Sequence, residues 1–133
     1  MMNRCDLRVF SDGALPDWVA LGRARTICLM GSEPQVEGLV LDAVDAGTFA
    51  FVCCGELANQ IEDSIDEVLE RSEDMFDIMT TAHTGEMVDD IAFFIAVALG
   101  GDEPFRVLAF VHSDDEQALA VCAALKDYVA IPA

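Results

Sequence analysis

The stretch of residues 48–69, TFAFVCCGELANQIEDSIDEVL, constrains the fold more than any other part of the chain. Its first seven residues are apolar and rich in β-branched and aromatic side chains, a run long enough for a strand and too short for a helix. After Gly55, apolar residues recur every four positions and predict one buried helix face, formed by Leu57, Ile61, Ile65 and Leu69. A strand buried on both faces that leads straight into an amphipathic helix is half of a βαβ unit.

The same alternation of strand and helix continues along the chain. We expect further strands over residues 6–10, 26–30, 78–80 and 105–111. One helix is expected to begin at an N-cap formed by Ser32 and to stop at Gly47, and another is expected over residues 84–99. A last helix is expected to follow a capping box formed by Ser113 and Glu116. A short helical turn is expected after Pro16, with Trp18 anchoring it on the core.

This pattern predicts an α/β fold: a single three-layer α/β/α domain over residues 1–133, with a mostly parallel sheet of four or five strands. A flavodoxin-like strand order is the first expectation for this number of elements. The first strand is the exception, since it could also lie antiparallel at an edge.

The charge balance is strongly acidic. Asp and Glu number 25 against 7 Lys and Arg, so the formal net charge is −18. A field of this sign repels nucleic acid and anionic lipid and favours cations or a basic protein partner, so we expect neither nucleic-acid nor membrane binding. The alternative is that the charge only keeps the chain soluble.

Five cysteines lie mostly inside apolar runs, and none shows C-x-x-C spacing. Because no cationic, apolar leader opens the chain either, we expect a cytoplasmic location with reduced thiols. The longest apolar run, residues 91–99, is far below the ~20 residues that a membrane span needs. A helix apolar on every side needs extra cover, which the first segment or a second copy in a homodimer would supply.

In open α/β sheets, ligands bind outside the carboxyl ends of the strands. The corners expected at that edge are residues 31–33, 54–56, 80–83 with Glu86 beyond, and 112–115. Each corner has a carboxylate near a helix N-terminus, where it stabilises the helix and occupies the place of a phosphate. Because the chain also lacks G-x-G-x-x-G and G-x-x-x-x-G-K-[ST], we expect no nucleotide and no cofactor.

The same corners contain both histidines of the chain, His83 and His112. Histidine beside carboxylates suits general acid–base catalysis, and the candidate catalytic residues are His83, Glu56 and Asp114. The alternative is that the histidines only cap carbonyls in polar loops. No H-x-x-x-H, H-E-x-x-H or C-x-x-C spacing is present, so no metal ligands are assigned. Cys54 is a weak candidate nucleophile, because Glu56 follows it and a thiolate needs electropositive surroundings.

Several short motifs resemble a family of small bacterial proteins of unknown function. They are Pro16-Asp17-Trp18, Phe51-Val52-Cys53 with Gly55-Glu56, Asp63-Ser64-Ile65-Asp66-Glu67, and Met79-Thr80-Thr81-Ala82-His83 with Glu86. The similarity runs from about Leu7 to Val111, although family members often carry an aromatic residue where Ala82 stands. The resemblance implies no activity, cofactor or partner. Together with the corner residues, it marks these candidate ligand-binding positions: Thr80, Thr81, His83, Glu86, Asp63, Asp66 and His112.

Two functions follow as hypotheses. The first is a non-catalytic protein-interaction or binding module that acts through its acidic surface. The second is a hydrolase or transferase that uses His83 with Glu56 or Asp114 at the sheet rim. A divalent cation at the acidic rim is a third alternative. The substrate, the partner and the oligomeric state are not encoded in any of these motifs.

Overall fold

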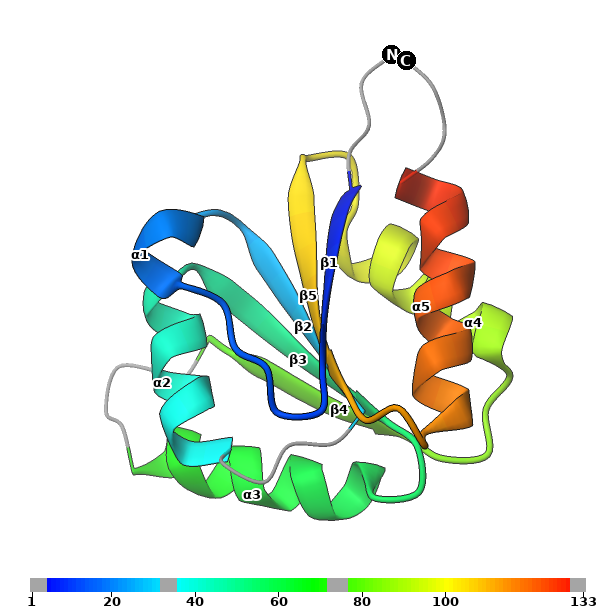
Figure 1. Cartoon of the computed structure of the whole chain (residues 1–133), viewed down its shortest axis with the longest axis horizontal. Helices are drawn as coiled ribbons and strands as arrows, with labels where there is room; N and C mark the ends of the chain where they lie inside the picture. The colour runs from blue at the N-terminus through cyan, green and yellow to red at the C-terminus, as the bar shows by residue number, and fades with distance from the viewer. Residues whose placement is uncertain (1–4, 32–35, 72–76, 130–133) are drawn as a thin grey trace.

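The computed structural model describes residues 5–31, 36–71 and 77–129. Its five strands form one sheet in which every neighbouring pair is parallel (Figure 1). The strands are β1 (Cys5–Ser11), β2 (Thr26–Met30), β3 (Thr48–Cys54), β4 (Met79–His83) and β5 (Phe105–Val111). The helices are α1 (Trp18–Leu21), α2 (Val36–Asp45), α3 (Ala58–Glu70), α4 (Val88–Phe93), the π-helix η1 (Phe94–Leu99) and α5 (Glu116–Val129).

The strand order is β1-β5-β2-β3-β4, which departs from the expected flavodoxin-like arrangement. After β4 the chain crosses back over the sheet, and β5 inserts between β1 and β2. Burial explains this placement, because all seven residues of β5 are buried and need a neighbour on each side. In contrast, β1 exposes Asp6 and Arg8 and lies at an edge, parallel to β5 rather than antiparallel.

Helices cover both faces of the sheet, which confirms the three-layer α/β/α architecture (Figure 1). Helices α1, α2 and α3 cover one face, and α4, η1 and α5 cover the other. The adjacent residues Cys53 and Cys54 show the division, since Cys53 packs under α2 and α3 and Cys54 belongs to the opposite core. Trp18 packs near Phe110, with ring centroids 6.5 Å apart, and so anchors α1 as expected.

Several expected boundaries change in the structure. Strand β4 extends to His83, and the long helix expected over residues 84–99 begins only at Val88 and becomes a π-helix at Phe94. At α5 the expected Ser113 cap is wrong: the carboxylate of Asp115 accepts the Ala118 N–H at 3.0 Å. The expected helix start at Ser32 lies outside the described residues.

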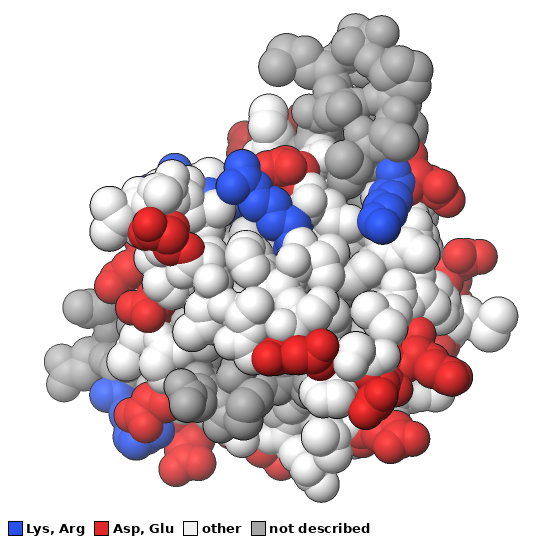
Figure 2. Space-filling model, in the orientation of Figure 1, with Lys and Arg blue, Asp and Glu red and all other residues white. Residues whose placement is uncertain are grey.

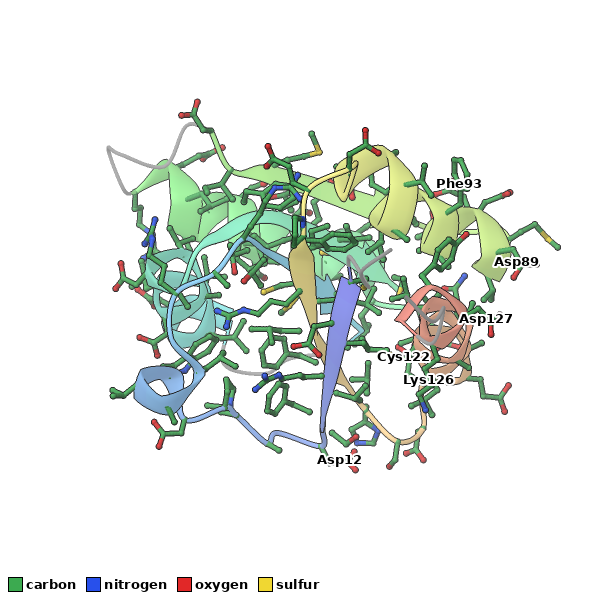
Figure 3. All side chains as sticks on the ribbon, turned by 90° about the horizontal axis from the view of Figure 1, so that it is seen from above. Asp12, Asp89, Phe93, Cys122, Lys126 and Asp127 are labelled. Carbon is green, nitrogen blue, oxygen red and sulfur yellow. The ribbon has the colours of Figure 1, made fainter. Side chains whose placement is uncertain are left out.

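The apolar helix that needs cover, α4 with η1, packs against α5. The first segment cannot supply that cover, because Trp18 lies on the opposite face of the sheet. Phe93 remains 54% exposed and points away from the sheet (Figure 3), and Val97 is also exposed. A homodimer through these side chains stays a prediction.

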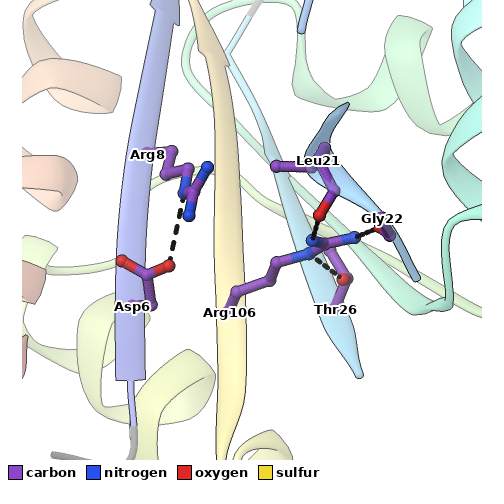
Figure 4. A network of polar contacts seen from close by, with 6 residues as sticks. All are labelled: Asp6, Arg8, Leu21, Gly22, Thr26 and Arg106. Atoms are coloured by element: carbon purple, nitrogen blue, oxygen red, sulfur yellow. Dashed lines mark hydrogen bonds and ion pairs between the residues drawn. The ribbon is translucent and has the colours of Figure 1, made fainter. Parts of the chain in front are cut away.

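At the amino edge of the sheet, the Arg106 side chain binds the ends of two helices, and Figure 4 shows its bonds to Leu21, Gly22 and Thr26. It donates to Thr26 Oγ1 at 2.7 Å and to the carbonyl oxygens of Leu21, Gly22 and Ala46 at 3.1, 2.7 and 3.0 Å. These carbonyls lie at the C-terminal ends of α1 and α2, where a cation is favourable. Desolvation by burial lowers the pKa of Arg106 from its usual value.

Candidate functional site

Because all strands are parallel, the turns that leave them lie on one border of the sheet. A pocket of about 810 Å³ opens on this border. On the face seen in Figure 2, acidic groups gather at the lower right, where β5 leads into α5. The residues that line the pocket are Gly31, Gly55, Glu56, Leu57, Thr84, Gly85, His112, Asp114, Asp115, Glu116 and Gln117.

The pocket lies where the chain connections diverge. The chain leaves β2 toward α2 on one face of the sheet and leaves neighbouring β5 toward α5 on the other. Such a switch point opens a crevice at the carboxyl ends of the strands, and ligands of open α/β sheets bind there. Gly31 and His112, which follow β2 and β5, both line this crevice.

Asp115 packs against two of the glycines that line the pocket, Gly31 and Gly55. A Cβ atom at Gly55 would lie 2.3 Å from Asp115 Oδ2, and one at Gly31 would lie 3.4 Å from the same oxygen. Gly55 also has a φ of +90°, a conformation that side chains other than glycine's rarely adopt. The glycines therefore allow a carboxylate to pack directly against the ends of β2 and β3.

Gln117 connects three parts of the pocket wall. Its Oε1 accepts the N–H of Gly55 at 2.7 Å, and its Nε2 donates to the carbonyl oxygen of Glu86 at 3.3 Å. One side chain of α5 thus ties the end of β3 to the loop after β4. Sequence reasoning missed Gln117; the available signal was only an amide in the first turn of a helix at the expected ligand edge.

The electrostatic character of the pocket is negative. Among the described residues that line it, four are carboxylates, namely Glu56, Asp114, Asp115 and Glu116, and none is Lys or Arg. At its margin, Asp12 Oδ1 accepts the Ser113 N–H at 2.9 Å, and this bond lowers the pKa of Asp12. The two ring nitrogens of His112 each lie 3.6 Å from a carboxylate, one of Asp12 and one of Asp114.

His83 lies outside this pocket, in a separate cluster next to its wall. Its Nε2 is 3.0 Å from Thr81 Oγ1, and its Nδ1 is 2.5 Å from a carboxylate oxygen of Glu86. The ring is 8% exposed and packs against Phe94, with centroids 5.0 Å apart. Neither Glu56 nor Asp114, the partners expected for His83, is among its contacts in the described part of the chain.

The remaining candidate positions divide between these places. His112, Glu56 and Asp114 line the pocket, whereas Thr81, His83 and Glu86 form the separate cluster. Thr80 alternates with Thr81 along β4, and its Oγ1 is buried with no hydrogen-bond partner among the described atoms. On α3, Asp63 is exposed and Asp66 half-buried, and neither lines the pocket.

Neither a group of three metal ligands nor an ionised thiol is found at the pocket border among the described residues. Within residues 5–31, 36–71 and 77–129, no three His, Cys, Asp or Glu side chains are grouped as metal ligands. Burial, followed by the charge of Asp115, raises the pKa of Cys54 to about 12, so this thiol is protonated at neutral pH.

The fold and the pocket define a small, open α/β domain with an acidic cavity at the carboxyl edge of its sheet. The chain belongs to the family described as Domain of unknown function (DUF7684), whose model matches residues 5–128. No curated protein and no solved structure matches it significantly. Across the described residues, the helices are too short or too polar to cross a membrane.

Proposed function

We propose that this protein is a binding module whose acidic pocket receives a basic segment of a partner protein. The observation that carries the proposal is the composition of the pocket: its described lining has four carboxylates and no Lys or Arg around a cavity of about 810 Å³. Volumes of roughly 300–1,000 Å³ are typical of ligand sites, so the cavity can accept one or more long side chains.

The charge of the pocket favours a cationic ligand over an anionic one. Asp115 caps the first turn of α5, so its carboxylate occupies the position that a phosphate would take at a helix N-terminus. An ammonium or guanidinium group would instead find acceptor oxygens on Glu56, Asp114 and Glu116, which are exposed at the mouth. Lysine and arginine side chains present these groups on flexible stems that reach into a cavity.

The state of the cysteines favours an intracellular partner. All five cysteines are buried and free, as is typical of proteins in a reducing cytoplasm. The net charge of −18 would also speed association with a basic surface. Because exposed charges are screened beyond ~8 Å at physiological ionic strength, binding should weaken as salt rises.

The test is the affinity for a fluorescent Lys/Arg-rich peptide, measured by anisotropy at increasing salt. The triple variant E56Q/D114N/E116Q removes three charges from the pocket, and D42N/E67Q/E70Q removes three exposed charges from α2 and α3. Both variants have a net charge of −15, that is −18 plus 3. We expect the pocket variant to lose at least about tenfold in affinity and the control less than about threefold.

Equal weakening in the two triple variants would show that the overall field, and not the pocket, attracts the peptide. Binding that persists undiminished at high salt would also contradict the proposal, because it would not depend on these charges.

A further inference from the structure

A hydroxyl, an imidazole and a carboxylate are aligned beside the pocket. Thr81 Oγ1 is 3.0 Å from His83 Nε2, and a carboxylate oxygen of Glu86 is 2.5 Å from His83 Nδ1. The two partners therefore use different nitrogens of one ring. The cluster is separate from the acidic pocket, although Gln117 of the pocket wall donates to the Glu86 carbonyl oxygen.

The carboxylate decides which nitrogen carries the proton. An ionised Glu86 can only accept, so the neutral ring donates from Nδ1 and leaves the lone pair on Nε2. Nε2 then accepts the hydroxyl proton of Thr81, which is the direction of transfer that activates a hydroxyl as a nucleophile. Contact with the Phe94 ring further restricts the orientation of the imidazole.

The hydroxyl lies at an accessible place in the fold. Thr81 is partly exposed on β4, the last strand of the sheet order, so among the described strands only β3 flanks it. Thr80, its neighbour, belongs to the opposite side of the strand and lacks such a partner within the described residues.

We propose that Thr81, His83 and Glu86 form an acyl-transfer site for esters or thioesters. The Thr81 oxygen attacks the acyl carbonyl carbon, a new C–O bond forms, and the hydroxyl proton passes to His83 Nε2. The bond to the leaving alkoxide or thiolate then breaks, and His83 returns the proton to it. Water attacks the carbonyl carbon of the acyl-threonine while His83 Nε2 accepts its proton. The bond between the acyl carbon and Thr81 Oγ1 then breaks, His83 returns the proton to Thr81 Oγ1, and the carboxylic acid leaves. Glu86 acts as a positioning residue that holds the ring in one tautomer.

The experiment uses the full chain and p-nitrophenyl acetate, following p-nitrophenolate release and the site of acetylation by peptide mass mapping. We expect one acetyl group on Thr81. T81V keeps the shape of the side chain but removes the hydroxyl, so it should abolish this adduct, and H83Q should slow acylation by ~100-fold or more. T80V, on the opposite side of β4, is the matched control and should retain the wild-type rate.

A second measurement separates positioning from general stability. The His83 Nδ1 proton should give a far-downfield NMR signal in the wild type, and E86Q should shift or remove it and slow acylation at least ~10-fold. E86D should restore part of the NMR signal and part of the acylation rate. The melting temperatures show that each variant is folded.

Acetylation elsewhere in the chain, or wild-type rates in folded T81V, would overturn the assignment. So would the absence of any Thr81 adduct with a reactive ester. None of these results would bear on peptide binding at the pocket, which is measured without an ester.

Discussion

Arg106 shows how one residue joins segments that are far apart in the sequence. It lies near the start of β5, is 6% exposed, and donates to Thr26 and to three carbonyl oxygens at helix ends. No carboxylate is among these acceptors, so backbone dipoles balance the buried charge. From the sequence, Arg106 is only a charged residue near the start of an apolar strand, and nothing in its neighbours indicates burial.

Replacing Arg106 with Met should destabilise the protein. The change leaves the carbonyls of Leu21, Gly22 and Ala46 without this donor, and we expect the free energy of unfolding to fall by about 3 kcal/mol. Urea denaturation measures the difference. Arg8→Met is the control, since exposed Arg8 pairs on the surface with Asp6 (Figure 4), and its cost should stay within about 0.5 kcal/mol. Equal costs at both positions would contradict this account of Arg106.

Gly55 is a second residue whose role depends on its surroundings. Gly55→Ala should lower the free energy of unfolding by about 2 kcal/mol, because a Cβ there meets Asp115 and φ is +90°. Gly38→Ala is the matched control: Gly38 lies in α2 with open space around it, so alanine should stabilise by about 0.5–1 kcal/mol. Chemical denaturation of both variants measures whether the free energy of unfolding falls for Gly55→Ala and rises for Gly38→Ala. An unchanged free energy in Gly55→Ala would show that Asp115 moves aside freely.

The candidate sites were only partly predictable at this scale. His83 and Glu86 are three residues apart, and their contact follows from the turn after β4. The contact with Thr81 follows from strand alternation, since residues two apart share a face. Of the expected partners, Asp114 follows β5, which lies three strand spacings, about 14 Å, from β4. Glu56 follows β3, the direct neighbour of β4, but it is not among the contacts of His83 in the described residues.

At the scale of elements, the pattern of apolar residues was sufficient to predict the bounds of the central strands. The expected ranges 26–30, 48–54 and 105–111 agree with β2, β3 and β5, which are buried throughout or nearly so. Strand order was not predictable from the same pattern, because β5 pairs with β1 across about a hundred residues. The nearly continuous apolar run of β5 was nevertheless a usable signal, since a strand with apolar residues on both faces is typical of the sheet interior.

The start of α5 gives a prediction at this scale. The sequence pattern S-x-x-E favours Ser113 as the cap, but Asp115 accepts the Ala118 N–H. We therefore expect Asp115→Ala to lower the free energy of unfolding by about 1 kcal/mol, and Ser113→Ala to change it by less than about 0.5 kcal/mol. Thermal unfolding followed by circular dichroism distinguishes the two variants. A larger loss of stability for Ser113→Ala than for Asp115→Ala would show that Ser113 is the cap.

For the whole molecule, charged side chains at the two edges of the sheet complement the helix ends that lie there. Carboxylates gather at the carboxyl edge, where α5 begins, and arginines bind carbonyls at the amino edge, where helices end. Arg23 donates to the Asp45 carbonyl and Arg25 to those of Leu99 and Gly100. Each charge thus has the sign opposite to the partial charge of the nearby helix end, which is favourable. At the carboxyl edge these carboxylates surround a cavity, which is the acidic pocket.

The buried thiols predict alkaline sensitivity of the whole fold. Burial raises the pKa of Cys5 and Cys122 to about 11 and that of Cys28 and Cys54 to about 12. Unfolded thiols ionise near about 8.5, so their contribution to stability is complete below that pH and falls as pH rises toward the folded values. Urea unfolding under reducing conditions at rising pH should show this decline, and Cys122→Ala should make it shallower. A free energy of unfolding that stays flat from neutral pH to about 10.5 would contradict the burial of these thiols.

The central claim, that the acidic pocket receives basic segments, is tested most directly by amide NMR shifts during titration with a Lys/Arg-rich peptide. Gly31, Gly55 and Gly85 line the pocket, whereas Gly22, Gly47 and Gly101 lie at the amino edge and serve as controls of the same residue type. We predict saturable shifts of the first three glycine amides that diminish with salt, and little change in the other three. Shifts spread evenly over both edges, or confined to the exposed face of α4 and η1, would contradict the claim.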